Sequence, residues 1–584
     1  MVVDILGEQL VKLQDAPFLL NISIASPEVL QRHIVEALGV EITMPVGGTI
    51  QGDYKETIGR KGGCDVVYPR NDEEFEAARD NIQCLEFNNW GVSDAPEKLA
   101  RLRNLVDANE AVAAFRFPIA GTEGLVGMEI QASRLLPPPK EVVDISLADH
   151  DSDVILIGEN RYLGFPTKIH MLPVDRKQHM YIVGQTGTGK TTLLKTMILS
   201  DMKAGHGLAV IDPHGDLFEE LLALVPAGRV DDVVVLDPSD EEYPVGLNVL
   251  EYGDKEEKRF IVRELKSIVE RLLNDQYGNG AINFTGPVFY QYLQNGMLFV
   301  MSDPEKPGTI LDFYNLFMVP GYYERWIPLK DKDNNLEAFV GILEKISPEI
   351  TSRPRPGEIS MGEYLASKFE DFVFDTRLRR IFEQEKSTID FNKIMDQGKI
   401  LLVNLAKGLL TEASSRFLGM LIMAKLHAAA MKRVRYPLPQ RKPFYIYVDE
   451  FQSLTTSNFT MLLSEARKFG IGLVLANQFV HQITDDIIKH AIFGNVGTIV
   501  TFRVGQTDSE LLEPHFRPYF DAHDLTNLPN WNACVKMSVN GQVVRPYSMH
   551  TLLPEEKPDE ETARLVRELS RQKYGKKYVV GETG

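Results

Sequence analysis

The sequence predicts an α/β fold built on a mainly parallel sheet, with a helical insertion and a separate N-terminal α/β domain. From residue 179 onward, short apolar runs alternate with helical stretches, and near-continuous apolar runs are typical of strands covered on both faces. A glycine-rich turn joins the first of these strands to a helix at residues 184–191. The alternation stops between residues 254 and 395, where helix-like stretches dominate.

Residues 1–140 are expected to form the separate N-terminal domain, and the run Pro137-Pro138-Pro139 stiffens its exit. Ser26-Pro27-Glu28 is a helix-starting signal. We expect a strand at 18–24 and helices at 26–38, 73–80 and 95–109. No group of residues in this domain suggests catalysis, so a structural or recognition role is its simplest interpretation. Residues 141–178 are predicted to form a small β segment that leads into the next domain.

Residues 179–254 and 396–550 are expected to form the core domain, with 255–395 inserted into it and 551–584 forming a C-terminal helix and tail. Core strands are predicted at 180–183, 207–211, 233–236, 400–405, 444–448, 471–476 and 498–502. Insertion helices are predicted at 255–274, 285–301, 308–317, 335–346 and 361–383. The remaining elements are helices at 192–203, 411–434 and 558–574, and a hairpin within 532–550 that turns at Asn540-Gly541.

The glycine-rich turn carries the strongest chemical signal, because it fits the Walker A pattern G-x-x-x-x-G-K-S/T at every fixed position. Glycines let backbone N–H groups point at phosphate oxygens, and the following helix adds its positive end. Lys190 can reach the β- and γ-phosphates, and the Thr191 hydroxyl can ligate Mg²⁺. A turn without a ligand is the alternative, but the flanking strand and helix favour a bound nucleoside triphosphate. The expected binding residues are Gly184, Gln185, Thr186, Gly187, Thr188, Gly189, Lys190, Thr191 and Thr192.

An acidic pair, Asp449-Glu450, ends the strand at 444–448, where a parallel sheet places its ligand-binding groups. Asp449 would hold Mg²⁺ through water beside Thr191, and Glu450 would take a proton from the attacking water. Helix capping is the alternative for this pair. Gln478 follows the next core strand, and its amide can hydrogen-bond the γ-phosphate or that water. Residues 212–216 end the strand at 207–211 and would serve either the outer shell of the metal or helix capping.

Composition limits the function classes. The net charge of −19 argues against a protein that coats DNA with its whole surface, although a nucleic-acid motor needs only a few basic loops. Cys64, Cys84 and Cys534 lie far apart, which indicates a reducing compartment without a disulfide framework or a zinc site. The first thirty residues carry charges, and no stretch of about 18 apolar residues follows, so we expect a soluble cytoplasmic protein without a transmembrane segment.

In this order the motifs resemble the HerA/FtsK superfamily of ring-forming translocases, over about residues 155–550. The closest likeness is to the branch of type IV secretion coupling proteins of the TraD/TraG kind and conjugation ATPases. The resemblance implies a RecA-like P-loop ATPase core that uses ATP and Mg²⁺, a homohexamer with ATP at the subunit interfaces, and DNA in the ring channel. The residues that carry it are 184–192, 211–216, 447–450, 466–470, 476–478 and 502–505.

The resemblance also implies that an Arg from a neighbouring subunit neutralises charge on the γ-phosphate. Arg467 and Arg503 match family positions for this role, and a guanidinium suits it because its planar fork stays charged. The sequence departs from the family pattern at Gln178, where relatives often carry Arg, and Arg176 or Lys177 would have to substitute. We also expect no membrane anchor of the kind usual in coupling proteins, which moves the likeness toward soluble HerA-type or conjugation-assembly ATPases.

Three functions remain open at this point. The first is an ATP-driven DNA translocase, with the basic segment 432–442 or the residues 407–415 touching DNA. The second is a secretion-apparatus ATPase, peripheral to a membrane complex, that moves protein through a secretion channel. The third is a ring-shaped scaffold that regulates a partner nuclease or effector in phage defence. The sequence holds no nuclease signature of its own.

Overall fold

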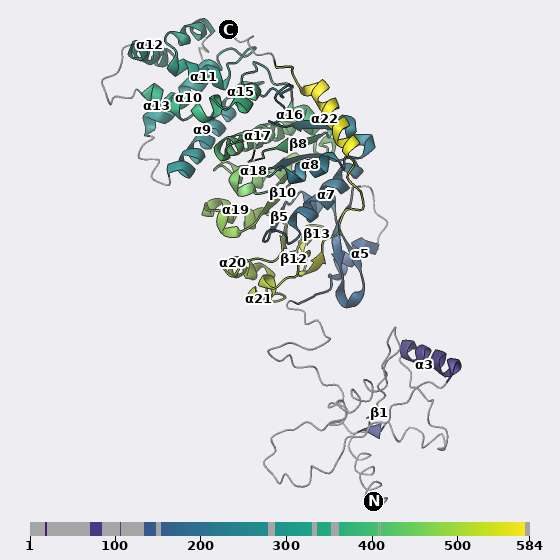
Figure 1. Cartoon of the computed structure of the whole chain (residues 1–584). Helices are drawn as coiled ribbons and strands as arrows, with labels where there is room; N and C mark the ends of the chain where they lie inside the picture. The colour runs from purple at the N-terminus through teal and green to yellow at the C-terminus, as the bar shows by residue number, and fades with distance from the viewer. Residues whose placement is uncertain are drawn as a thin grey trace, which may run out of the picture. The chain divides into compact units, whose positions relative to one another are not determined.

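The computed structural model describes residues 18–19, 71–84, 105–106, 134–147, 153–277, 286–329, 336–351, 361–406, 408 and 410–578. The chain divides into two units, Met1–Ile130 and Gln131–Gly584, which are described separately (Figure 1). The boundaries predicted for the finer domains remain predictions.

In the smaller unit, β1 (Phe18–Leu19) pairs antiparallel with β2 (Leu105–Val106), and α3 spans Asp72–Cys84. Helix α3 confirms the helix expected at 73–80. The helix expected at 95–109 is wrong at residues 105–106, which form a strand. Pairing with another apolar segment far along the chain overrides the local periodicity there, and Val106 is β-branched and suits a strand. The helix predicted at 26–38 lies outside the described residues.

The larger unit is built on one 11-stranded sheet in the order β4-β3-β15-β12-β11-β5-β10-β9-β6-β8-β7. From β11 to β7, each strand is parallel to the next one in the sheet, which confirms a mainly parallel sheet. The parallel strands are β5 (Met180–Val183), β6 (Gly207–Asp212), β7 (Val233–Leu236), β8 (Ile400–Asn404), β9 (Phe444–Val448), β10 (Ile471–Asn477) and β11 (Thr498–Thr501). Each coincides with a predicted strand to within a residue, because an unbroken apolar run is a strong local signal.

An antiparallel wing extends the sheet beyond β11. It consists of β12 (Asn532–Lys536), β15 (Tyr547–His550), β3 (Ile155–Asn160) and β4 (Thr167–Met171). The β segment expected before residue 179 is therefore part of the main sheet. The hairpin expected at Asn540-Gly541 is confirmed, because β13 (Ser538–Val539) and β14 (Gln542–Val543) pair across these two residues, both with positive φ.

Helices cover both faces of the sheet and form two apolar clusters. Ile182 of β5 faces one cluster and Tyr181 faces the other, as the two-residue period of a strand requires. The first face is covered by α5 (Lys140–Leu147), α7 (Lys190–Ala204), α8 (Asp216–Leu222) and α22 (Glu560–Tyr574). The second is covered by α16 (Phe391–Gln397), α17 (Glu412–Lys432), α18 (Phe459–Glu465), α19 (Asp486–Asn495), α20 (Gln506–Phe516) and α21 (Ala522–Thr526).

Between β7 and β8 the described residues include a β-bridge from Val245 to Gly575, one 3₁₀ helix (Tyr322–Leu329) and a series of α-helices. They are α9 (Lys255–Tyr277), α10 (Pro287–Val300), α11 (Ile310–Met318), α12 (Glu337–Thr351), α13 (Met361–Ser367), α14 (Glu370–Val373), α15 (Thr376–Phe382) and α16. Figure 1 shows α9 to α15 gathered at one end of the larger unit. The single helix expected at 361–383 is wrong, because Asp375 caps a new helix by accepting N–H bonds from Arg377 and Leu378. None of the helices in the described ranges is both long and apolar enough to cross a bilayer.

Candidate nucleotide-binding site

The phosphate loop, residues 184–189, connects β5 to α7 at the carboxyl edge of the parallel strands. Gly187 and Gly189 have φ values of 76° and 121°, a region that L side chains rarely adopt. A Cβ on Gly189 would lie 3.0 Å from the Phe502 ring and 3.1 Å from the Cα of Trp531. The glycines of the motif are therefore required by backbone conformation and by close packing.

Lys190 begins α7 and is buried, with its Nζ donating to the carbonyls of Gly184 and Gln185. Burial lowers the pKa of Lys190, while the charges of Asp449 and Glu450 act to raise it. The ammonium thus lies within electrostatic reach of both acids. Thr191 is exposed on the same first turn of α7, and Thr188 is buried and bonds back to the Gln185 carbonyl at 2.7 Å.

The acidic pair lies at the same edge. Strand β10 separates β9 from β5, and the register aligns Leu475 with both Val448 and Tyr181. Burial, followed by the charges of Glu450 and Asp212, raises the pKa of Asp449 to about 6, and only Lys190 and a hydrogen bond from the Glu450 N–H act in the other direction. The site therefore gathers three carboxylates against one ammonium.

Glu450 is held in an unusual backbone conformation. It has φ 47° and ψ 42°, its N–H donates to the Asp449 carboxylate at 3.0 Å, and its side chain is buried. Its Oε2 accepts from Gln452 Nε2 at 2.5 Å, and the same amide reaches Gln482 Oε1 at 3.3 Å. A left-handed non-glycine residue costs about 1–3 kcal/mol and persists where the surroundings impose it, often at functional sites. No sequence motif links Gln452 or Gln482 to Glu450, because each is a glutamine in a loop without a characteristic spacing.

Asp212 ends β6 and is fully buried. Its carboxylate accepts N–H bonds from His214 and Phe218, both at 2.9 Å, so it caps the turn into α8. Capping is therefore the observed role of this residue, while its charge still acts on Asp449.

Gln478 directly follows β10, between the acidic pair on β9 and the phosphate loop on β5. It is half-buried and makes no side-chain hydrogen bond within the described part of the chain, so its amide is available to a ligand. Neighbouring Asn477 is instead committed to the fold, because it accepts from Tyr181 at 2.9 Å and donates to the Phe479 carbonyl at 2.8 Å.

The two arginines lie at opposite edges of the sheet. Arg503 follows β11 and contacts the phosphate loop of its own chain, because its carbonyl accepts from the Gln185 N–H at 2.8 Å and its Nε lies 3.4 Å from Gln185 Oε1. Arg467 is exposed in a 3₁₀ turn, Ala466–Phe469, just before β10. This turn lies at the amino edge, where Arg467 acts electrostatically on Asp175 and His179. The fold therefore brings only Arg503 to the site of its own chain.

Three other basic residues considered from the sequence have structural partners. Arg176 is fully buried and forms a two-bond ion pair with Asp201, so it does not replace the missing Arg at Gln178. In the basic segment 432–442, Arg433 is buried and lies 3.5 Å from Asp396, and Lys432 pairs with Glu257 at 2.5 Å. These side chains are not free for DNA phosphates. Residues 407 and 409 of the other expected DNA loop lie outside the described residues.

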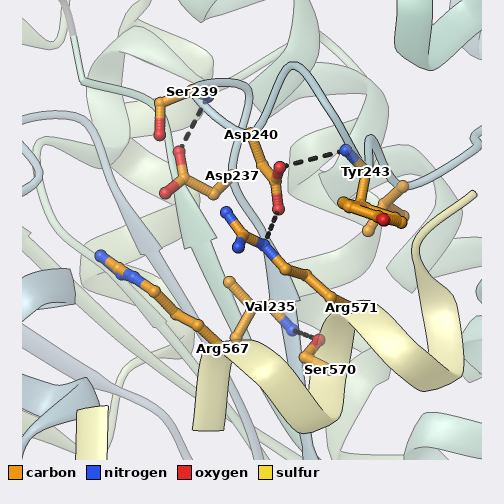
Figure 2. A pocket seen from close by; sticks show the side chains of 9 residues that line it. Val235, Asp237, Ser239, Asp240, Tyr243, Arg567, Ser570 and Arg571 are labelled. Carbon is orange, nitrogen blue, oxygen red and sulfur yellow. Dashed lines mark hydrogen bonds and ion pairs between the residues drawn. The ribbon is translucent and has the colours of Figure 1, made fainter. Parts of the chain in front are cut away.

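The pocket in Figure 2 lies elsewhere, between the end of β7 and α22. Its charged groups are paired or capped: Arg571 donates to Asp240 at 2.5 Å, and Asp240 accepts from the Tyr243 N–H at 3.1 Å. Ser570 accepts from the Val235 N–H at 2.9 Å. The contacts fasten α22 to the edge of the sheet.

Residues 164–284, which include the phosphate loop, match the protein family described as Helicase HerA, central domain. This segment of the chain is similar to the central domain of HerA. This match confirms the resemblance to the HerA/FtsK superfamily that the motifs indicate. The RecA-like P-loop core is the fold that the parallel sheet, the loop and the acidic strand end describe together.

A curated relative is the type 4 coupling protein DotL of Legionella pneumophila, which is 20% identical over 349 residues. That alignment covers 52% of this chain and 44% of DotL, so the chain spans less than half of this relative. Among solved structures, the plasmid coupling protein TrwB in complex with ADP and Mg²⁺ is 14% identical, with a TM-score of 0.49 over 73% of this chain and 95% of TrwB. VirB4 of Thermoanaerobacter pseudethanolicus is 14% identical, with a TM-score of 0.46 over 70% of this chain and 98% of VirB4.

Proposed function

We propose that this chain is an ATP-hydrolysing subunit of a ring-shaped translocase, and that its cargo is DNA. The observation that carries the proposal is the convergence of Lys190, Asp449 and Glu450 at one edge of the sheet. These residues come from segments 260 residues apart, and a Walker A lysine beside an acidic strand end is the arrangement that phosphoryl transfer requires. The HerA-type central domain supports the same reading.

The residues fit ATP and Mg²⁺ on their own chemistry. Asp449 and its acidic neighbours concentrate negative charge, which a divalent cation would neutralise. Mg²⁺ is usually held by one or two carboxylates together with phosphates and water, so a larger cluster of protein ligands is not needed. Asp449 and the Thr191 hydroxyl would hold the cation, and it would draw charge from the phosphate oxygens.

In hydrolysis, the loop N–H groups between Gly184 and Thr192 bind the phosphates. Lys190 exchanges its bonds to the loop carbonyls for bonds to phosphate oxygens. The Glu450 carboxylate accepts a proton from the attacking water, and the Gln452 amide orients that carboxylate. Gln478 lies between the two halves of the site and contacts the γ-phosphate or the water.

The test is the ATPase rate at low salt without DNA, with single-stranded DNA and with double-stranded DNA, together with the mass of the assembly. Lys190→Ala supplies the inactive baseline. We expect a hexamer whose rate rises several-fold with at least one form of DNA. A rate unchanged by either form, with no DNA binding at low salt, would contradict DNA as the cargo.

Ring assembly is tested by mixing inactive subunits. Arg467 lies away from the nucleotide site of its own chain, so we propose that it serves a neighbouring subunit, whereas Arg503 serves the phosphate loop of its own chain.

Arg467→Ala is expected to slow hydrolysis by about 10³-fold without weakening nucleotide binding. Mixed with Glu450→Gln subunits it should regain partial activity, because some interfaces then combine an intact Arg467 with an intact Glu450. Arg503→Ala should weaken nucleotide binding itself. No recovery in mixed rings would contradict the role of Arg467 between subunits.

A second candidate is a secretion-apparatus ATPase that moves protein. Two observations favour it: the net charge is −19, and the basic segment turns Lys432 and Arg433 toward acidic partners. DotL, a coupling protein by name, is also similar to the chain. Copurification with secretion-channel proteins, together with an ATPase rate that DNA leaves unchanged, would select this candidate over the first.

A further inference from the structure

Trp531 lies against the phosphate loop, although nothing in the sequence links it to the site. Its N–H donates to the Thr188 carbonyl at 2.7 Å, and its own carbonyl accepts from the Thr551 N–H at 2.8 Å. Its Cα lies 3.1 Å from the position that a Cβ on Gly189 would take. The backbone of Trp531 is therefore fixed at the start of α7.

The backbone of Trp531 is strained and its side chain is open to solvent. Its φ is 63°, and a bulky residue in this region is a genuine outlier. Its side chain is 49% exposed, whereas Trp326 in the helical insertion is only 3% exposed. A large aromatic group left half in water beside a phosphate loop contributes little to the core. Strain of this kind is typical of ligand sites.

The strand order on the two sides of β5 shows on which side of the phosphate loop Trp531 lies. On one side lie β10 and β9, which carry Gln478, Asp449 and Glu450. On the other side lie β11 and β12, and β12 begins directly after Trp531. A nucleotide whose γ-phosphate is directed toward Glu450 has its base at the opposite end of the phosphate chain. That end is on the side of β11 and β12.

We propose that the indole of Trp531 is the platform on which the nucleobase of the bound triphosphate stacks. The inference rests on the proposed function, because it assigns a further part of the same ligand. An aromatic face binds a base through stacking, which tolerates any base because every base has a π-face. The backbone bonds to Thr188 and Thr551 hold this face beside the loop that binds the phosphates, so one segment positions both ends of the nucleotide.

The experiment compares binding of Mg-ATP with binding of inorganic tripolyphosphate, which lacks the base, by titration calorimetry. Trp531→Asn removes the ring, and Asn tolerates the left-handed backbone conformation, so the turn is retained. Trp531→Phe keeps an aromatic face. Leu553→Ala is the matched control, because Leu553 is 76% exposed just beyond Thr551, and its truncation removes an exposed apolar side chain from the same region.

We expect Trp531→Asn to weaken Mg-ATP binding by about tenfold, as the loss of roughly 1.4 kcal/mol of stacking implies, and to leave tripolyphosphate binding unchanged. Trp531→Phe should lose less, and Leu553→Ala should lose nothing. Mg-ATP should also quench an emission component that is present in the wild type and missing in Trp531→Phe.

Two results would overturn the inference. Unchanged Mg-ATP affinity in Trp531→Asn would show that the base does not contact the indole. An equal loss of Mg-ATP and tripolyphosphate binding would show that Trp531 only shapes the loop. A wild-type protein that binds neither ligand would instead overturn the proposed function, and this inference with it.

Discussion

Buried charges are partnered differently at the two ends of the parallel strands. These are the amino edge of the sheet, where the strands begin, and the carboxyl edge, where they end. At the amino edge, Asp175 accepts the N–H groups of Asn540 and Gly541 at 2.9 and 2.8 Å. His179 lies 3.0 Å from the Leu463 carbonyl and accepts from the Leu473 N–H at 3.1 Å. Burial, aided by the charge of Arg467 and opposed only by the bond to Leu463, lowers the pKa of His179 to about 4, so the ring is neutral at pH 7.

The amino edge also holds a compact ionic cluster. Arg176 pairs with Asp201 and lies over the Tyr445 ring, with its guanidinium carbon 3.3 Å from the ring centroid. Tyr447 donates to the same aspartate, and His206 lies 2.9 Å from it. Burial opposes ionisation, but the charge of Arg176 and the hydrogen bonds to His206 and Arg176 hold the pKa of Asp201 below its ordinary value.

The carboxyl edge lacks such a balance: within the described residues, the charges of Glu450 and Asp212 raise the pKa of Asp449, and Lys190 supplies the one cationic charge that lowers it. The backbone of Glu450 has the left-handed conformation, and the Lys190 ammonium donates to a carbonyl of its own loop. At the amino edge Arg176 and Asp201 are paired with each other, whereas at the carboxyl edge the acidic charges outnumber the one cation that acts on Asp449. Substitutions at the amino edge are therefore expected to change the free energy of unfolding, and substitutions at the carboxyl edge to change the ATPase rate.

The largest effect is expected at the carboxyl edge. Glu450→Gln keeps the shape of the side chain and removes its ability to accept a proton, so hydrolysis should fall by about 10²- to 10⁴-fold while ATP binding persists. Steady-state ATPase rates and nucleotide binding would be measured on the same preparation. Asp486→Asn, on the surface of α19, serves as the control and should retain full activity. Normal turnover in Glu450→Gln would remove this residue from the role of base.

At the amino edge, the expected effect is on stability. Asp201→Asn leaves the Arg176 guanidinium buried without its counter-charge, which costs about 3–5 kcal/mol of unfolding free energy in comparable cases. Urea denaturation of the nucleotide-free protein measures this loss. Asp231→Asn is the matched control: Asp231 also pairs with a cation, Lys573, but on the surface, so its replacement should change stability very little. An equally small loss in Asp201→Asn would show that the buried pair is not needed.

The residues that meet at the carboxyl edge could be predicted from the sequence better than the contacts at the amino edge, for a physical reason. The phosphate loop and the pair Asp449-Glu450 are each local patterns attached to an apolar strand, and parallel strands bring such ends together. The partner of Arg176 is a single aspartate one helix away, and no spacing rule identifies it. Trp531 and Gln452 reach the site through backbone turns, which no side-chain pattern encodes.

The fold shows the same division. The strand β6 was predicted almost to its last residue because Gly207 to Ile211 is apolar throughout. The strand order, and the addition of β3 and β4 to the wing, depend on contacts between distant segments. Leu105 and Val106 likewise pair with Phe18 and Leu19 far away in the sequence, and the helix predicted there is wrong because local periodicity does not report this contact.

The smallest effect sharpens the comparison at the carboxyl edge itself. The pKa of Asp449 is about 6 in the folded chain, against about 3.9 in an unfolded one, so the folded state binds more protons between these values. The unfolding free energy of the nucleotide-free protein should therefore fall as pH rises from about 4 to 6 and stay reduced above it. Asp449→Asn removes this contribution and should stabilise the protein at pH 7.5 by an amount on the order of 1 to 3 kcal/mol.

The same variant should gain little stability from Mg²⁺ added with ATP, because it lacks the carboxylate proposed to hold the cation. Urea unfolding at pH 5 and pH 7.5, with and without Mg-ATP, measures both changes. A variant less stable than the wild type at pH 7.5 would mean that Asp449 is a structural residue, and the contrast between the two edges would fail at this position.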